Sequence, residues 1–366
     1  MKQLLLTAAM IGALAAPAMA DDGYLTKPRH HKNVTSSVPD NGDQNPYAIF
    51  VAPASAGKIK KDDVLVDNFN NAKNLQGTGS TIMIYHPDTE ETTLFADIPH
   101  DLKGCPGGVG LSTAMAVLKS GHVIVGSTPS TDGTTATKGA GCLIVLDSNG
   151  QVVSTIAGKN INDPWGNMAV IDHGDSATLF VSNTGFGVGA PAAPDPVVNK
   201  ATILRIELST AGKTPVVKSQ TMIASGLSEQ AAKDVFIIGP TGLALSADHK
   251  TLYASDAINN RVVAIDNPTT LTGPGNLREV TKEGFLHRPL AMVMAPNGNL
   301  LVTNGKNGQV VEINPASGKQ IAAQWLNADK AQVPPGSGNL FGIAMKPTGD
   351  GFYYVEDDTN NLSVSE

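Results

Sequence analysis

Clustered positive charge is missing from this sequence, although it contains 26 lysine and arginine residues against 33 acidic ones. A surface that binds the phosphates of nucleic acid needs concentrated positive charge, so we expect no nucleic-acid partner. Aromatic side chains make up only 5% of the residues, whereas glycine occurs 38 times and proline 23 times. This composition favours many short strands joined by turns over packed helices.

Common catalytic sequence motifs are also absent. The chain contains no Gly-x-Ser-x-Gly elbow, no His-Glu-x-x-His pair, no phosphate-binding loop and no haem-attachment Cys-x-x-Cys-His. Beyond residue 20 no apolar run is long enough to cross a bilayer, so we expect no membrane span. Sequence motifs therefore leave binding and catalysis both open.

The first twenty residues, 1–20, have the features of a secretory signal peptide rather than of a folded element. Lys2 provides a positive charge, residues 4–15 form a short apolar run, and Ala18-Met19-Ala20 is a small-x-small cleavage pattern. No cysteine follows the cleavage site, which argues against a lipid anchor. We therefore expect the mature chain to begin at Asp21 and to be periplasmic or secreted.

The chain has only two cysteines, Cys105 and Cys142. In an oxidising compartment they are expected to form a disulfide, which for a loop of this size contributes about 4 kcal/mol by the chain-entropy estimate. The alternative is a pair of buried thiols. Metal binding is disfavoured, because no second Cys or His lies at ligand spacing beside either residue.

Three segments near the C-terminus repeat one pattern, which is the strongest structural indication in the sequence. Residues 256–262 (DAINNRV), 304–310 (NGKNGQV) and 357–363 (DDTNNLS) align without gaps, and each follows a short apolar strand. One strand earlier, each copy has a fully apolar run that ends in a turn. Continuous apolar runs are typical of strands buried on both faces, as at the hub of a propeller.

The same unit recurs upstream in looser form, which gives six copies. Each copy has a marker residue at the end of its second strand: Asn68, Ser127, Asn183, Asp256, Asn304 and Asp357. Copies at this spacing predict an all-β fold, a six-bladed β-propeller of four-stranded antiparallel blades. The Asn and Asp markers are expected to cap turns by bonding backbone N–H groups two residues on, rather than to hold a metal.

The sixth copy stops after its third strand and so lacks the outermost strand of a blade. An open ladder edge must be covered, and the N-terminal segment 21–45 is the natural donor. Within it, residues 33–37 are best suited to form the closing strand, and the alternative is that this segment is disordered. The propeller itself is expected to span residues 46–366 and to act as a monomer.

The stretch 240–266 resembles an NHL repeat and a blade of the SMP-30/gluconolactonase-like six-bladed propellers. The resemblance is strong in the last three copies, moderate in the second and third, and faint in the first. It implies the propeller fold. It also implies a lactonase or esterase-type hydrolase that holds a divalent cation, calcium or zinc, with a Glu, an Asn and an Asp near the channel entrance. Thr241 stands where the Asn would be and Leu290 where the Asp would be, which weakens the hypothesis of a metal-dependent hydrolase.

The positions at which the innermost strands begin form the expected channel mouth. They are Thr113, Trp165 or Gly166, Thr241, Leu290 and Phe341. This apolar, partly aromatic mouth has two interpretations: a small-molecule pocket, or a plug of core side chains. Beside it, His287 and Arg288 are placed to bind an anionic or carbonyl group, and the plainer alternative is a surface histidine without a ligand.

Three long connections lie on the same face as the mouth. They are residues 69–80, 128–141 and 185–200, and they form either a lid over the channel or solvated insertions.

Our first hypothesis is an exported, non-catalytic propeller without a cofactor, which binds a small molecule or a protein partner through its channel face. The alternative is the divalent-metal-dependent lactonase or esterase. The residues predicted to bind the ligand are Trp165, Thr241, His287, Arg288, Leu290 and Phe341.

Overall fold

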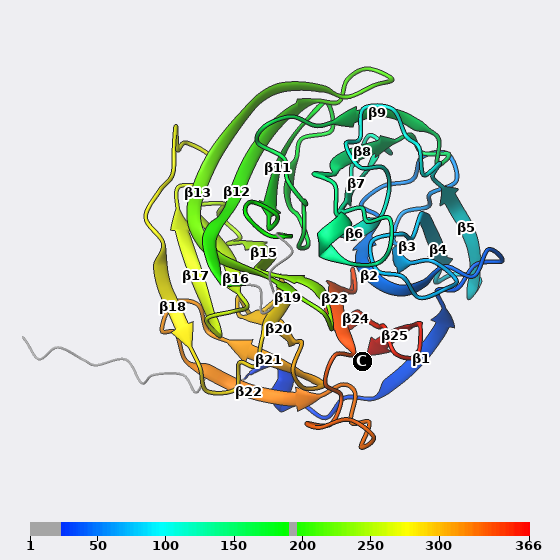
Figure 1. Ribbon diagram of the computed structural model, residues 1–366. Helices are drawn as coiled ribbons and strands as arrows, with labels where there is room; N and C mark the ends of the chain where they lie inside the picture. The colour runs from blue at the N-terminus through cyan, green and yellow to red at the C-terminus, as the bar shows by residue number, and fades with distance from the viewer. Residues whose placement is uncertain (1–22, 190–195) are drawn as a thin grey trace, which may run out of the picture.

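The computed structural model describes residues 23–189 and 196–366, and nearly all of its regular structure is β-strand. Six sheets form a ring of blades around a central axis (Figure 1). Two 3-10 turns, Tyr24–Thr26 and Thr135–Thr137, are the only helical elements in this part of the chain. The predicted six-bladed propeller is confirmed, whereas the predicted signal peptide lies outside the described residues.

The strands follow the blades in chain order, with the innermost strand of each blade first and the outermost last. Blade VI takes its outermost strand from the N-terminus, and blade III has a short fifth strand. The bounds are as follows: blade I, β2 (Gln44–Val51), β3 (Val64–Asn70), β4 (Thr81–His86), β5 (Glu91–Asp97); blade II, β6 (Leu111–Val117), β7 (Val123–Ser127), β8 (Cys142–Leu146), β9 (Val152–Ile156); blade III, β10 (Ala169–Asp172), β11 (Ser176–Asn183), β12 (Val198–Ser209), β13 (Val216–Ala232), β14 (Phe236–Ile238); blade IV, β15 (Pro240–Leu245), β16 (Thr251–Asp256), β17 (Arg261–Asp266), β18 (Arg278–Lys282); blade V, β19 (Pro289–Met294), β20 (Leu300–Asn304), β21 (Gln309–Ile313), β22 (Gln320–Trp325); blade VI, β23 (Leu340–Met345), β24 (Phe352–Glu356), β25 (Asn361–Ser365), β1 (His31–Ser36).

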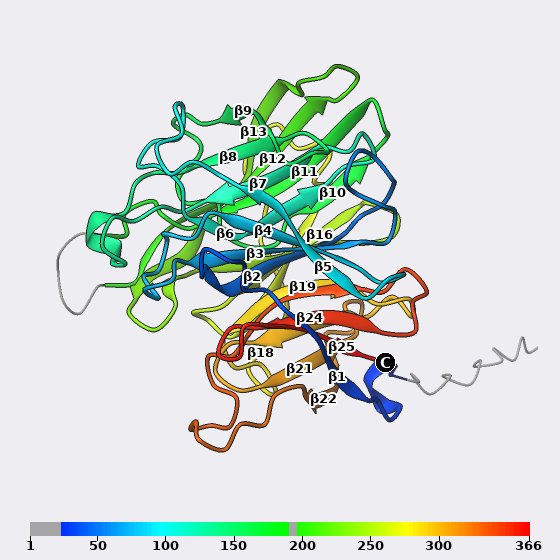
Figure 2. The ribbon, with the colours of Figure 1, turned by 90° about the vertical axis from the view of Figure 1, so that its right-hand side faces the viewer.

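The N-terminal segment supplies the missing strand of the last blade. β1 pairs antiparallel with β25, from His31 opposite Ser365 to Ser36 opposite Asn361. Figure 2 shows β1 running along the outer edge of that blade. The strand begins two residues earlier than the sequence pattern indicated, and it closes the ring as predicted.

Just before β1, the chain is also anchored to blade V. The backbone N–H groups of Tyr24 and Leu25 donate to the carboxylate of Glu312 at 2.7 and 2.8 Å. Glu312 lies on β21 and is fully buried, and it also accepts a hydrogen bond from the Asn299 side chain at 2.7 Å. A buried carboxylate is tolerated where hydrogen bonds replace its hydration. The N-terminal segment and blade V therefore stabilise one another.

Apolar side chains fill the spaces between neighbouring blades. Strands β3, β6 and β7 are buried along their whole length, although β3 includes the polar residues Asp67, Asn68 and Asn70. The outermost strand β18, by contrast, has no buried residue.

Cys105 and Cys142 form the expected disulfide, which joins the connection before β6 to the start of β8. It therefore ties the loops of blade II to its sheet.

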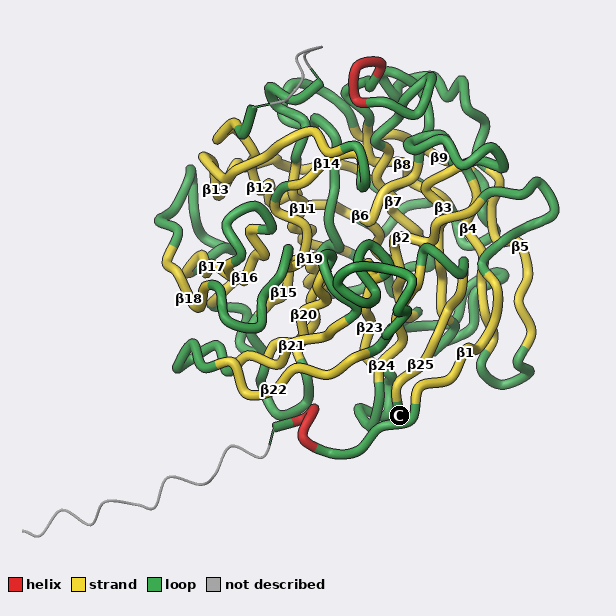
Figure 3. Tube along the Cα trace, turned by 60° about the horizontal axis from the view of Figure 1, so that its bottom comes forward, coloured by secondary structure: helices red, strands yellow, loops and turns green. Residues whose placement is uncertain are grey.

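Blade III departs from the repeat because its outermost strand is extended. β13 runs for 17 residues, and its end turns back into β14, with Gln230 opposite Ile238 and Ala232 opposite Phe236. Figure 3 shows β13 passing from the rim of the ring inward to β14. We call residues 230–238 the mouth hairpin. No feature of the sequence had indicated it.

Candidate functional site

All six innermost strands begin at one face of the ring, which we call the loop face. The connections between the second and third strands of blades I, II and III also lie there, and they are long: residues 71–80, 128–141 and 184–197. Figure 2 shows long loops gathered on this side of the molecule. Residues 190–195 of the third connection lie outside the described residues, so the lid hypothesis stays a prediction.

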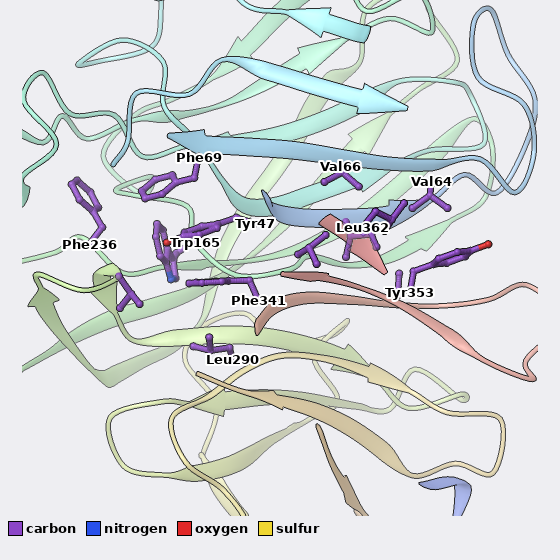
Figure 4. Close-up of a cluster of buried hydrophobic side chains, with 14 of the residues drawn as sticks. Tyr47, Val64, Val66, Phe69, Trp165, Phe236, Leu290, Phe341, Tyr353 and Leu362 are labelled. Atoms are coloured by element: carbon purple, nitrogen blue, oxygen red, sulfur yellow. The ribbon is translucent and has the colours of Figure 1, made fainter. Parts of the chain in front are cut away.

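Five aromatic side chains pack together at the channel mouth on the loop face (Figure 4). Tyr47 stacks on Phe341 and on Phe69, with ring centroids 3.8 and 4.5 Å apart. Trp165 meets Tyr47 and Phe69 edge-on, at 5.9 and 5.4 Å. Phe236 of the mouth hairpin packs edge-on against Phe69 at 5.6 Å. Stacked and edge-on pairs are the favourable geometries of aromatic rings, so this is a well-packed cluster.

The aromatic cluster closes the mouth. Its five rings and Leu290, which packs with them, are each at most 3% exposed. Of the two interpretations of the apolar mouth, this arrangement is the plug of core side chains. Ligand binding by Trp165, Leu290 and Phe341 stays a prediction, and it would require the plug to open.

Hydroxyl groups fix the beginnings of the innermost strands around the plug. Ser255 accepts a hydrogen bond from the Gly242 N–H at 2.6 Å and donates to the Leu290 carbonyl at 2.8 Å. The hydroxyl of Thr241, a predicted ligand-binding residue, is buried and donates to the Gly239 carbonyl at 3.0 Å. Buried polar groups that are satisfied in this way have no need of a ligand.

The divalent cation that the resemblance implies does not fit this mouth. A calcium ion takes roughly six to eight oxygen ligands, and zinc takes nitrogen, sulfur or carboxylate ligands. The entrance positions instead carry Tyr47, Thr241, Leu290 and Phe341, whose side chains are buried in the core. Across residues 23–189 and 196–366, no three His, Cys, Asp or Glu side chains gather so that they could hold a metal ion. The residues at the mouth therefore do not form a divalent-metal site.

Below the plug, the channel contains a cavity that faces away from the loop face. Its volume is about 280 Å³, and it is lined by the far ends of β2, β15, β19 and β23 and by residues 167–170, where β10 begins. Asn167 lies at the end nearest the plug, and its amide donates to the carbonyls of Leu243 and Met292 at 2.9 and 3.1 Å. The amide therefore links strands β15 and β19 across the channel.

Three marker residues contact the chain differently from the prediction. Asn304 accepts a hydrogen bond from the His287 N–H at 3.0 Å, and Asn183 accepts one from the Asn162 N–H at 3.1 Å. Asn68 donates to the Ser37 carbonyl at 2.8 Å. Each marker thus holds the segment that enters its own blade, instead of capping a turn two residues on. Such contacts arise because the second strand ends beside the start of the innermost strand.

A separate pocket of about 250 Å³ lies on the loop face, beside the plug. It combines apolar walls with cationic groups, and it is lined by Gln230, Ile238, Ala257, Ile258, Asn260, His287, Arg288 and Lys306. The predicted residues His287 and Arg288 thus lie together. The others on the ligand list, Trp165, Thr241, Leu290 and Phe341, are absent from its lining.

Arg288 and Lys306 share a carboxylate from the mouth hairpin. Arg288 Nη1 lies 2.8 Å and Lys306 Nζ 3.0 Å from the same oxygen, Oδ2 of Asp234. Burial raises the pKa of Asp234, but the hydrogen bonds from the two cations outweigh burial and hold this pKa below its ordinary value. Asp234 is therefore charged at neutral pH, and it compensates only one of the two positive charges.

The backbone of Arg288 is held in an unfavourable conformation. Its φ angle is +57°, in the left-handed region that non-glycine residues rarely adopt. The Arg288 N–H donates to Oδ1 of Asn260 at 2.7 Å, which helps to hold this geometry, and the side chain is only 10% exposed. Strained residues of this kind cost about 1–3 kcal/mol and cluster at functional sites. Arg288 is thus a fixed cation at the pocket wall.

A second polar cluster is buried at the loop face between blades II and III. Lys138 Nζ lies 2.6 Å from Asp163 Oδ2 and donates to Asn162 at 3.2 Å. Burial raises the pKa of Asp163 to about 6, although Lys138 opposes the shift. Burial also raises the pKa of Glu229 on β13 to about 8, again against the charge of Lys138. No sequence motif accompanies these side chains, so the sequence does not distinguish them.

The described residues contain no helix of the length and apolarity needed to span a membrane.

A protein-family model described as an SMP-30/gluconolactonase/LRE-like region matches residues 197–332. Regucalcin from Xenopus laevis is 37% identical over 93 residues, which are 24% of this chain and 30% of that protein. The match therefore spans less than a third of the length of this relative. The suspected resemblance to this family is confirmed.

Solved structures extend the likeness of fold to nearly the whole chain. A gluconolactonase from Xanthomonas campestris superposes with a TM-score of 0.57 at 13% identity, over 92% of this chain and 89% of that one. Regucalcin from Agrobacterium tumefaciens, described as a calcium-binding protein, gives 0.54 at 12% identity, over 90% and 92%. Virginiamycin B lyase from Staphylococcus aureus gives 0.53 at 13% identity, over 92% and 85%. At such identities the likeness concerns the fold alone.

Proposed function

Starting from an SMP-30/gluconolactonase-like propeller, we propose that this chain binds a small organic molecule in the loop-face pocket of His287, Arg288 and Lys306. The observation that carries the proposal is the arrangement of Arg288. Its guanidinium is nearly buried, its backbone is strained, and it lines a pocket of about 250 Å³. A concave, partly apolar site with a few fixed polar groups is the usual form of a small-molecule pocket.

The pocket favours a molecule with a carbonyl or anionic group. Arg288 and Lys306 supply positive charge on one side, and Ile238 and Ile258 supply apolar wall. A concave pocket of this size suits a small molecule better than a protein partner, which needs a wide contact surface. The aromatic plug then belongs to the scaffold, and the ligand binds beside the channel axis rather than on it.

A second candidate function is hydrolysis of a lactone or ester, and the comparisons favour it over simple binding. The family model carries gluconolactonase in its description, and a gluconolactonase is among the similar structures. Without a channel metal, acid–base chemistry would fall to Asp163 and Glu229, whose pKa values of about 6 and about 8 differ. Two carboxyl groups with separated pKa values can serve as base and acid at neutral pH.

A hydrolysis and binding assay in the presence of chelator separates the two candidates. Five- and six-membered lactones and aryl esters form the panel, and both turnover and melting temperature are measured. Binding alone predicts that some members raise the melting temperature without turnover, and that Arg288→Gln abolishes this shift. Catalysis predicts turnover that falls at least about tenfold in Glu229→Gln, a loss of general acid–base catalysis. The exposed Glu283→Gln is the control. If no compound shifts the melting temperature or turns over, both proposals are wrong.

A further inference from the structure

Asp234 pairs with both Arg288 and Lys306, two cations that line the loop-face pocket. We propose that Asp234 is an internal, displaceable ligand of Arg288 and Lys306, and that small apolar monocarboxylates bind the pocket by taking its place. The inference rests on the proposed function, because it names the ligand class of the same pocket. It also assigns a role to the mouth hairpin, from which Asp234 projects.

The contact joins one nearly buried cation, Arg288, and one half-exposed cation, Lys306, to a half-exposed carboxylate. The Arg288 side chain is 10% exposed, whereas that of Asp234 is 53% exposed. Both cations reach the same oxygen, Oδ2, at 2.8 and 3.0 Å. Ion pairs with a well-solvated partner contribute little to stability, so water or another anion can replace Asp234 at small cost. Arg288 stays in place when Asp234 leaves, because its backbone is held by Asn260 and its side chain is nearly buried.

Asp234 also leaves other nitrogens of the Arg288 guanidinium without a contact from its carboxylate. Its carboxylate contacts only Nη1 of Arg288. A free carboxylate that enters the pocket can align with two nitrogens of the guanidinium, and this bidentate geometry is stronger and more specific than a single contact. A ligand carboxylate can therefore compete with Asp234 for Arg288.

The walls of the pocket define the rest of the ligand. Ile238, Ala257 and Ile258 provide apolar surface beside the two cations, within a volume of about 250 Å³. Burying apolar ligand surface against them contributes about 25 cal/mol per Å². The pocket thus suits a compact molecule with one carboxylate and an apolar body, and an aromatic acid such as benzoate is a suitable probe.

Displacement of Asp234 would loosen the mouth hairpin. The hairpin tip is held by the two ion pairs of Asp234 and by long hydrogen bonds of 3.4 Å from Gln76 to the carbonyls of Lys233 and Asp234. Only three residue pairs connect β13 with β14. Removing the ion pairs leaves residues 235–238 anchored, because all four are buried in the apolar cluster of the plug. Ligand binding should therefore increase the mobility of the hairpin tip, residues 232–234.

Calorimetric titration with benzoate tests the proposal on the wild type, Asp234→Asn and Asp248→Asn. Asp248 is exposed, lies in the turn before β16 and pairs with Lys250, so its replacement changes the net charge equally, away from the pocket. We expect benzoate to bind the wild type, and benzamide, its neutral counterpart, to bind at least about tenfold more weakly, a difference of about 1.4 kcal/mol. Asp234→Asn should bind benzoate about three- to tenfold more tightly, since the competitor is gone. Asp248→Asn should match the wild type.

Hydrogen exchange of the mouth hairpin gives an independent readout, with faster exchange expected at its tip, residues 232–234, when benzoate is bound. Weaker binding by Asp234→Asn would overturn the proposal, because Asp234 would then assist the ligand. Slower exchange in the hairpin, or no benzoate binding by any variant, would also overturn it. None of these results bears on the neutral lactones and esters, whose dependence on Arg288 tests the proposed function separately.

Discussion

Glu229 illustrates how burial alters the chemistry of a single carboxyl group. Its side chain is fully buried, and burial raises its pKa to about 8 from the ordinary value of 4.5, although Lys138 favours the charged form. At a pH between these two pKa values, Glu229 is protonated in the folded protein and ionised in the unfolded chain. By linkage, this group lowers the free energy of unfolding as the pH rises from about 4.5 to about 8.

Glu229→Gln should therefore stabilise the protein in a pH-dependent manner. We expect the free energy of unfolding to rise by roughly 3 kcal/mol at pH 8 and to change little at pH 5, since the neutral amide has no proton to lose. Urea unfolding at both pH values measures the difference, with Glu283→Gln as the exposed control. An equal effect at pH 5 and pH 8 would show that packing, and not ionisation, governs this position.

The sequence identifies some residues of the loop-face pocket and its surroundings better than others. His287 and Arg288 can be found because they directly precede an innermost strand, whose place in the repeat is known. Their partner Asp234 lies 54 positions from Arg288 along the chain, outside every repeated segment. The pairing depends on how two blades are placed in space, which local sequence patterns do not encode.

At the scale of secondary-structure elements, the closing strand β1 joins the two ends of the chain in one sheet. Its ladder with β25 covers an edge that would otherwise expose unpaired backbone groups. The turn before it satisfies the buried Glu312, with two hydrogen bonds from backbone N–H groups. Loss of this segment would thus leave both an open strand and an under-satisfied buried carboxylate.

Deleting residues 23–37 should destabilise the fold sharply. We expect a loss of at least about 3 kcal/mol, because removing the partners of a buried charge alone costs about that much. Thermal and urea unfolding, compared with a chain that begins at residue 23, measure the effect. A truncated protein that unfolds like the longer chain would refute the closing role of β1.

The mouth hairpin shows why an element can escape prediction. Residues 228–233, Ser-Glu-Gln-Ala-Ala-Lys, include several good helix formers, yet they continue strand β13 and enter the hairpin. Tertiary contacts override the local preference: Phe236 packs into the plug, and the backbone pairs along β14. Repeated elements are predictable because six copies reinforce one pattern, whereas this hairpin occurs once.

For the whole molecule, the repeat determines the scaffold but not the site. The six apolar innermost strands and the absence of an outermost strand from the last copy predict the ring and its closure. The same innermost strands surround a mouth that in this chain is filled by Tyr47, Trp165 and Phe341. Residues of the repeat maintain the fold, and function depends on side chains that depart from it. This is why the loop-face pocket and the Lys138 cluster emerge only from the structure.

The channel mouth on the loop face is closed by buried core side chains, which do not suit a divalent metal. The most direct test is the melting temperature of the purified protein in chelator, in excess calcium and in excess zinc. A metal that binds only the folded state must raise the melting temperature, by mass action. We predict the same melting temperature under all three conditions. A rise of several degrees with calcium or zinc that chelator reverses would contradict the account.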